Sequence, residues 1–135
     1  MKKLFLSFVI AFLCFICYTD MQKVYCKRCG NSYNSVIAMS NSTCYKSTSK
    51  KHEVYEGLIT KQFYCIWCGN SYNTLQAMSN SNCFKNPNGR YHDPYEGSLK
   101  NKYTCQYCGN SYNTLQTMSN SNCFKSMHRK HVPLR

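Results

Sequence analysis

The sequence predicts three small metal-stabilised α+β modules in tandem, preceded by an N-terminal signal segment. One block recurs three times in the 135-residue chain, with start-to-start spacings of 39 and 40 residues. Each copy carries three cysteines and one histidine in the pattern C-x2-C-x14-C-x7-H, or x8 in the second copy. A fixed period of this length is typical of repeat proteins, in which each repeat is one supersecondary unit.

Three cysteines cannot all pair within one copy, but three thiolates and one imidazole complete a tetrahedral zinc site. We therefore expect three structural Zn²⁺ sites, one in each module. The third copy also contains His128, but the spacing favours a histidine three positions later. The twelve predicted ligands are Cys26, Cys29, Cys44, His52, Cys65, Cys68, Cys83, His92, Cys105, Cys108, Cys123 and His131.

Each module offers few apolar side chains for a core. A core this thin does not hold by itself, whereas structural zinc contributes about 10–16 kcal/mol in finger peptides at neutral pH. The metal is therefore the expected reason that each module folds. The second module illustrates the apolar set: Tyr64, Trp67, Tyr72, Leu75, Met78 and Phe84. The modules are predicted at residues 24–52, 63–92 and 103–131.

Each module is expected to begin with a zinc-knuckle turn at its Cys-x-x-Cys-Gly sequence. Gly30, Gly69 and Gly109 can adopt the left-handed conformation that such a turn requires. The two residues between the cysteines differ from copy to copy, which suggests exposed knuckle tips. Trp67 and Tyr107 at these tips are expected either to cover the knuckle or to contact a partner.

A short helix is expected after the knuckle. In the second module Tyr72, Leu75 and Met78 recur at a spacing of three, which fits one helix face. Asn73 is predicted to cap this helix, with Gln76 completing a capping box, and Asn113 and Gln116 repeat the pair. The third cysteine follows the helix.

These modules resemble two-Cys-two-His zinc fingers. Tyr72 lies four residues after Cys68, and Met78 lies six further on, which resembles the core spacing of a finger. The last two ligands depart from that pattern: Cys83 lies two residues beyond the usual histidine, and His92 lies well beyond finger spacing. The chain is also similar, over residues 24–131, to tandem CxxC-G repeat proteins of bacteria that carry export signals and have no assigned role.

The first nineteen residues read as a signal peptide. Lys2 and Lys3 precede an apolar run over residues 4–18 that Ser7 alone interrupts. Fifteen residues are short for a membrane span, which needs about 20. The expected location is therefore outside the cytoplasm: secreted, periplasmic or at the cell surface. An uncleaved N-terminal anchor is the alternative.

Export raises the possibility of disulfides, because oxidising compartments favour them over free thiolates. Nine cysteines follow Thr19, an odd number that leaves at least one unpaired or paired between chains. In this alternative each CxxC closes on itself, and Cys44, Cys83 and Cys123 pair across modules or chains. The recurring histidine would then have no role, which favours zinc.

The chain is strongly basic, with a formal charge of +12. Four of its five acids lie in the linkers between modules, and none is paired in a way that suggests acid–base catalysis. Bases gather between the third cysteine and the histidine, where they form either a polyanion-binding strip or a solvated surface. These candidate binding residues are Lys46, Lys50, Lys51, Lys85, Arg90, Lys125, Arg129 and Lys130.

The expected function is binding rather than catalysis, with no small-molecule substrate, because a four-ligand metal site leaves no open position. The expected partner is a polyanion or another repetitive structure: nucleic acid, acidic polysaccharide or an envelope surface. From Cys68 to Lys85 in the second module and from Cys108 to Lys125 in the third, the two sequences differ only at Ala77 and Thr117. Base-reading fingers usually differ from one to the next, so a DNA-reading finger protein is the alternative, and a disulfide-crosslinked secreted protein the second alternative.

Overall fold

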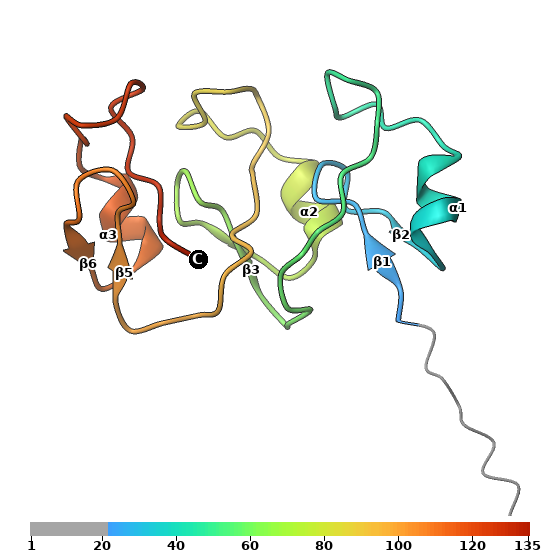
Figure 1. The fold of residues 1–135 in the computed structure, drawn as a ribbon, viewed down its shortest axis with the longest axis horizontal. Coiled ribbons are helices and arrows are strands. Elements are labelled where there is room, and N and C mark those ends of the chain that lie inside the picture. Colours follow the sequence, from blue (N-terminus) through green and yellow to red (C-terminus); the bar gives the residue numbers. More distant parts are fainter. Residues whose placement is uncertain (1–21) are drawn as a thin grey trace, which may run out of the picture.

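The computed structural model describes residues 22–135, which form three copies of one unit in a row (Figure 1). Each unit consists of a two-stranded antiparallel hairpin and a five-residue helix. None of the helices in this range is both long and apolar enough to span a membrane. The predicted signal segment lies outside the described residues. The elements in chain order are β1 (Val24–Tyr25), β2 (Ser32–Tyr33), α1 (Val36–Ser40), β3 (Phe63–Tyr64), β4 (Ser71–Tyr72), α2 (Leu75–Ser79), β5 (Tyr103–Thr104), β6 (Ser111–Tyr112) and α3 (Leu115–Ser119).

The predicted knuckle turn forms the tip of each hairpin. In the first unit the N–H of Gly30 donates to the carbonyl of Cys26 at 2.8 Å, and the N–H of Cys26 donates to the carbonyl of Asn31 at 2.9 Å. The three knuckle glycines have φ values of +74°, +73° and +75°. This left-handed conformation is costly for residues with a Cβ, which explains the glycine in every copy.

The helices are shorter than expected and begin one residue later than predicted. Tyr72 lies in β4, so only Leu75 and Met78 of the predicted apolar face are helical. The predicted cap at Asn73 is wrong: the cap is Thr74, whose hydroxyl accepts a hydrogen bond from the N–H of Ala77 at 3.0 Å. Thr114 caps α3 in the same way, in a capping box with Thr117 instead of Gln116. Thr74 itself is extended, with φ −142° and ψ 154°, so the helix does not begin earlier.

The segment after each histidine docks on its own hairpin. The N–H of Tyr55 donates to the carbonyl of Tyr25 at 2.7 Å, and the N–H of Lys27 donates to the carbonyl of Glu53 at 2.9 Å. The second and third units repeat these bonds. The linkers therefore have a defined geometry and are not flexible tethers; both have 12 residues between the histidine and the next cysteine.

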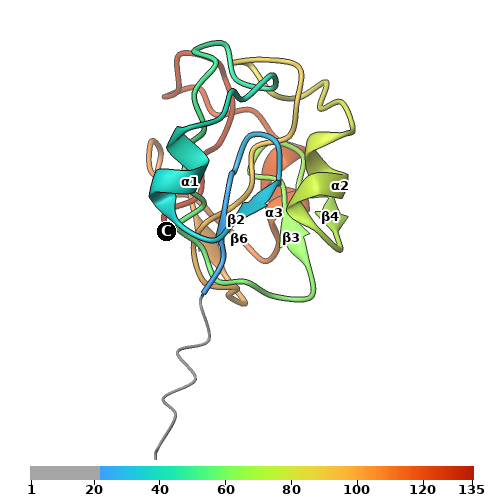
Figure 2. The same ribbon diagram turned by 90° about the vertical axis from the view of Figure 1, so that its right-hand side faces the viewer.

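The three units also pack on one another. The hydroxyl of Ser79 in α2 donates to the carbonyl of Cys29 in the first knuckle at 2.8 Å, and Ser119 in α3 donates to Cys68 at 3.0 Å. Gly30 packs so closely on α2 that a Cβ built there would lie 2.1 Å from the backbone nitrogen of Gln76. Each knuckle thus sits on the first turn of the next helix, and Figure 2 shows the resulting stack from its end.

Linker tyrosines build the core between neighbouring units. Tyr55 packs with Phe63, Leu75 and Met78 of the second unit, and Tyr95 packs with the matching residues of the third. The ring centroids of Tyr55 and Phe63 lie 5.8 Å apart in an edge-to-face arrangement. Because the backbone of Tyr55 is bonded to the first unit, this one residue belongs to two units.

The knuckle tips are not all exposed, contrary to expectation. Trp67 is buried, and its indole N–H donates to the Asp93 carboxylate at 2.7 Å. The same carboxylate accepts a hydrogen bond from Arg28 at 2.6 Å. Tyr107 alone of the two tip aromatics is exposed. The tips of the first two units are covered because each unit packs against its successor.

Candidate metal centres

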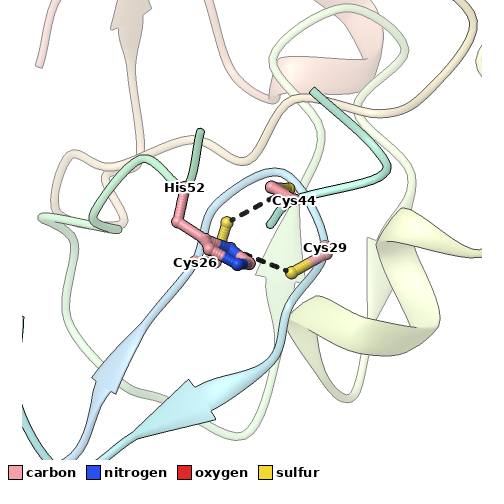
Figure 3. Close-up of side chains that lie close together, drawn as sticks. All are labelled: Cys26, Cys29, Cys44 and His52. Carbon is pink, nitrogen blue, oxygen red and sulfur yellow. Dashed lines mark hydrogen bonds between the residues drawn. The ribbon is translucent and has the colours of Figure 1, made fainter. Parts of the chain in front are cut away.

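The twelve predicted ligands form three clusters, one in each unit. In each cluster the four candidate ligand atoms lie within 4.8 Å of one another. Figure 3 shows the first cluster, in which Cys26, Cys29, Cys44 and His52 point toward a common centre. His131 belongs to the third cluster, whereas His128 is exposed and does not.

The distances within each cluster match a tetrahedral zinc site. Zn–S bonds of about 2.3 Å and Zn–N bonds of about 2.0–2.1 Å give tetrahedral edges of about 3.8 Å between sulfurs and about 3.5 Å between sulfur and nitrogen. The first and third cysteine sulfurs are 3.9, 3.8 and 3.9 Å apart in the three clusters. The second sulfur lies 3.6, 3.4 and 3.5 Å from the histidine Nδ1. The donor set therefore fits Zn²⁺ in size and in chemistry.

The same distances do not fit disulfides, whose sulfurs are about 2.05 Å apart. All nine cysteines in the described part of the chain are free thiols. The third cysteine of each unit lies beside the first cysteine of that same unit. This arrangement does not bring Cys44, Cys83 and Cys123 together across the units of one chain, which is one of the two pairings in the disulfide alternative.

Three backbone elements position the ligands. The hairpin tip carries the first two cysteines, and the chain leaving the helix carries the third. The N–H of Cys44 donates to the carbonyl of Lys50 at 2.9 Å, which closes a loop and brings the next residues back to the cluster. The histidine follows just before the segment that docks on the hairpin. Cys83 with Arg90, and Cys123 with Arg129, form the equivalent bonds at 2.8 and 3.0 Å.

A tyrosine orients the histidine of each cluster, a role that we did not predict from the sequence. The Nε2 of His92 lies 2.8 Å from the Tyr72 hydroxyl, while its Nδ1 faces the sulfur of Cys68. His52 with Tyr33 and His131 with Tyr112 repeat this contact at 3.0 and 2.9 Å. With Nε2–H donating to the tyrosine oxygen, Nδ1 presents its lone pair to the metal position. The signal in the sequence was the tyrosine four residues after each second cysteine.

Each cluster contains at least one cysteine whose pKa is lowered, which favours its thiolate form. Burial raises the pKa of Cys26 and of Cys105, but hydrogen bonds from knuckle N–H groups outweigh it and lower these pKa values to about 7 and about 6. The hydrogen bond with Cys65 lowers the pKa of Cys68 to about 6 despite burial. Burial raises the pKa of Cys29 to about 12. The thiolate is the form that binds metal.

The predicted basic residues all lie on the loops that run from the third cysteine to the histidine, but their surroundings differ. Lys85 reaches the next unit, where its ammonium donates to Asn120 at 2.7 Å. Lys46 lies 4.3 Å from the ring centroid of Tyr91. Lys50, Lys51, Arg90, Lys125 and Arg129 are exposed, and Lys130 is partly exposed.

Comparison of the chain with models of known protein families, with curated proteins and with solved structures finds no match. The class of protein therefore follows from the fold and the clusters themselves. Three repeated Cys3His clusters, each on a small hairpin with a short helix, define a tandem zinc-finger-like repeat protein whose clusters are suited to metal ions. The individual units differ from two-Cys-two-His fingers in having a third cysteine and a late histidine.

We expect Tyr72→Phe to weaken zinc binding by the second unit about 10–100-fold, because the histidine loses the partner that fixes its tautomer. The measurement is competition with a chromogenic chelator, with zinc counted by native mass spectrometry. Tyr64→Phe is the matched control, since that hydroxyl contacts only the exposed Gln62. Equal zinc affinity in the two variants would show that the tyrosine does not position the ligand.

Proposed function

We propose that this protein is a non-enzymatic, exported, zinc-binding repeat protein that binds a polyanionic or repetitive partner. The observation that carries the zinc assignment is the agreement of three separate clusters with tetrahedral zinc distances. Four protein ligands fill the coordination sphere, so each ion serves the fold and leaves no position for a substrate. Export rests on the basic and apolar N-terminal sequence.

The segregation of charge supports a polyanionic partner. Within residues 22–135 every acid is paired with Lys27, Arg28 or Arg135, and none of these three bases lies on a loop between a third cysteine and its histidine. Arg28 binds Glu53 through two nitrogens at 2.9 and 3.0 Å, and it also binds Asp93. Arg135 binds Glu56 at 2.8 Å and also binds Glu96. The loop bases therefore have no acidic partner among the described residues, and an external anion can supply one.

Backbone strain at two of the loop bases supports the same proposal. Lys50 and Arg129 have φ values of +60° and +55°, where glycine is the residue with no steric penalty. Arg90 occupies the matching place in the second loop, since all three carbonyls accept from the third cysteine. A basic side chain at each of these places, two of them in a strained conformation, indicates a selected function.

The packing of the units argues against base reading by their helices. Helices that read DNA place their first turn in the major groove. Here the first turns of α2 and α3 lie against Gly30 and Gly69 of the preceding units. This packing covers one side of each turn, although Gln76 and Gln116 stay exposed, so the loops offer a polyanion the freer contacts.

The double variant Lys50→Gly with Arg129→Gly tests the role of the loops. It is expected to fold at least as stably, because glycine suits both backbone conformations, but to elute from immobilised heparin at lower salt. The slope of log affinity against log salt should fall by about one per lost contact, so by about two. The control is Lys61→Ser with Lys102→Ser, which removes the same charge from exposed positions outside the loops. Equal elution of the two variants would contradict binding by the loops.

A further inference from the structure

The three loops between the third cysteine and the histidine lie on one side of the molecule. We call them the metal loops: residues 44–52, 83–92 and 123–131. Both views place them along the same edge, at the top of Figures 1 and 2, where they are coloured green, yellow and red. Lys46 of the first loop also contacts Tyr91 of the second. A single flat surface can therefore meet all three loops at once.

Each metal loop carries an exposed aromatic side chain directly after its buried third cysteine. Tyr45, Phe84 and Phe124 are 82%, 98% and 83% exposed. One exposed hydrophobic side chain is ordinary, but an exposed aromatic ring at the same place in all three repeats points to a common role. The neighbouring cysteine is a metal ligand, so each ring projects from a fixed point. Met127, also exposed, adds apolar surface to the third loop.

A lysine follows each of these aromatic residues, and further bases complete every loop. The lysines are Lys46, Lys85 and Lys125. None of the three metal loops contains an acidic residue. Apolar rings flanked by bases, with the acids paired to Lys27, Arg28 and Arg135 outside the loops, form a surface that is complementary to apolar material beneath a layer of negative charge.

We propose that the metal loops bind the surface of an anionic lipid bilayer. The rings enter the interfacial region, and the lysines and arginines contact the lipid phosphates. This inference rests on the proposed function and names its polyanion. A lipid surface fits better than a nucleic acid strand because it is flat, because it accepts the thioether of Met127 as well as the rings, and because export delivers the chain to a membrane.

The test is co-sedimentation of the zinc-loaded full chain with vesicles of phosphatidylcholine, with and without phosphatidylglycerol. We expect binding to the anionic vesicles that weakens with salt. The triple variant Tyr45→Ser, Phe84→Ser, Phe124→Ser should bind them at least about tenfold more weakly. The control is Ile37→Ser, Leu58→Ser, Leu99→Ser, which removes three exposed apolar side chains outside the loops. The N-terminal apolar run is the same in all of these proteins, and native mass spectrometry verifies three zincs in each.

Equal vesicle binding by the two triple variants would overturn the inference. Binding to heparin but not to anionic vesicles would overturn it while leaving the proposed function in place, whereas binding to neither would remove both. Aromatic-dependent binding to a single-stranded oligonucleotide, without binding to vesicles, would assign the loops to nucleic acid instead.

Discussion

Removal of zinc is expected to unfold all three units of this protein. The buried cluster of the first unit is Cys26, Cys44 and Met39, and the later units add only a few aromatic and leucine side chains. Structural zinc contributes about 10–16 kcal/mol per site in finger peptides. Native mass spectrometry should therefore show three zincs per chain, and circular dichroism should show loss of structure when a chelator removes them.

The decisive comparison uses protein purified from the cytoplasm and from the periplasm of an expression host. Zinc-loaded protein from both sources would extend the metal assignment to an exported chain. A chain without metal, lighter by two hydrogens for each cystine and folded in the presence of chelator, would contradict the zinc assignment and support the disulfide alternative.

Substitution of Gly69 by alanine is expected to destabilise the protein far more than the same change at Gly109. Both glycines have nearly the same left-handed φ, +73° and +75°, so the backbone penalty is common to both variants. A Cβ at Gly69 would lie 2.2 Å from the backbone nitrogen of Gln116, whereas a Cβ at Gly109 meets nothing within 4 Å. The excess effect therefore measures the packing of the second unit on the third.

We expect this excess to be about 1–3 kcal/mol, the usual cost of overpacking a well-packed contact. The measurement is urea unfolding of the two zinc-loaded variants, followed by circular dichroism. Limited proteolysis of Gly69→Ala should also detach the third unit from the first two. Equal midpoints for the two variants would mean that the units do not pack as described.

The clusters were predictable from the sequence because metal chemistry is local and repeats. The pattern of Cys26, Cys29, Cys44 and His52 recurs twice more at nearly the same spacing. This repetition alone distinguishes the ligands from cysteines without a common role. The left-handed glycines were predictable for the same reason, because a knuckle turn requires a residue without a Cβ. The tetrahedral distances confirm that the ligand sets come together, in this case without any help from a known relative.

The packing between units was not predictable, because its signals are single residues with ordinary alternative roles. Ser79 and Ser119 lie at the end of a helix, where serine commonly forms turns, yet each binds a carbonyl of the preceding knuckle. Trp67 was expected to cover the knuckle or to contact a partner, but it is bound to Asp93 of its own unit, and Arg28 of the first unit binds the same carboxylate. The prediction of the helix cap was wrong for a similar reason: asparagine and threonine are adjacent candidates, and the sequence does not reveal that the threonine stays extended.

The tyrosines shared between units allow the units to fold in order from the N-terminal one. Leu75 is buried by Tyr25, Tyr55 and Phe63, all of which precede it in the sequence, and Ser79 binds a carbonyl that is earlier still. The second unit can therefore complete the core around Leu75 against residues that have already emerged, whether from a ribosome or from an export channel. A chain built in this way can fold from its first unit onward, and each completed unit then presents its knuckle and its linker tyrosine to the unit that follows.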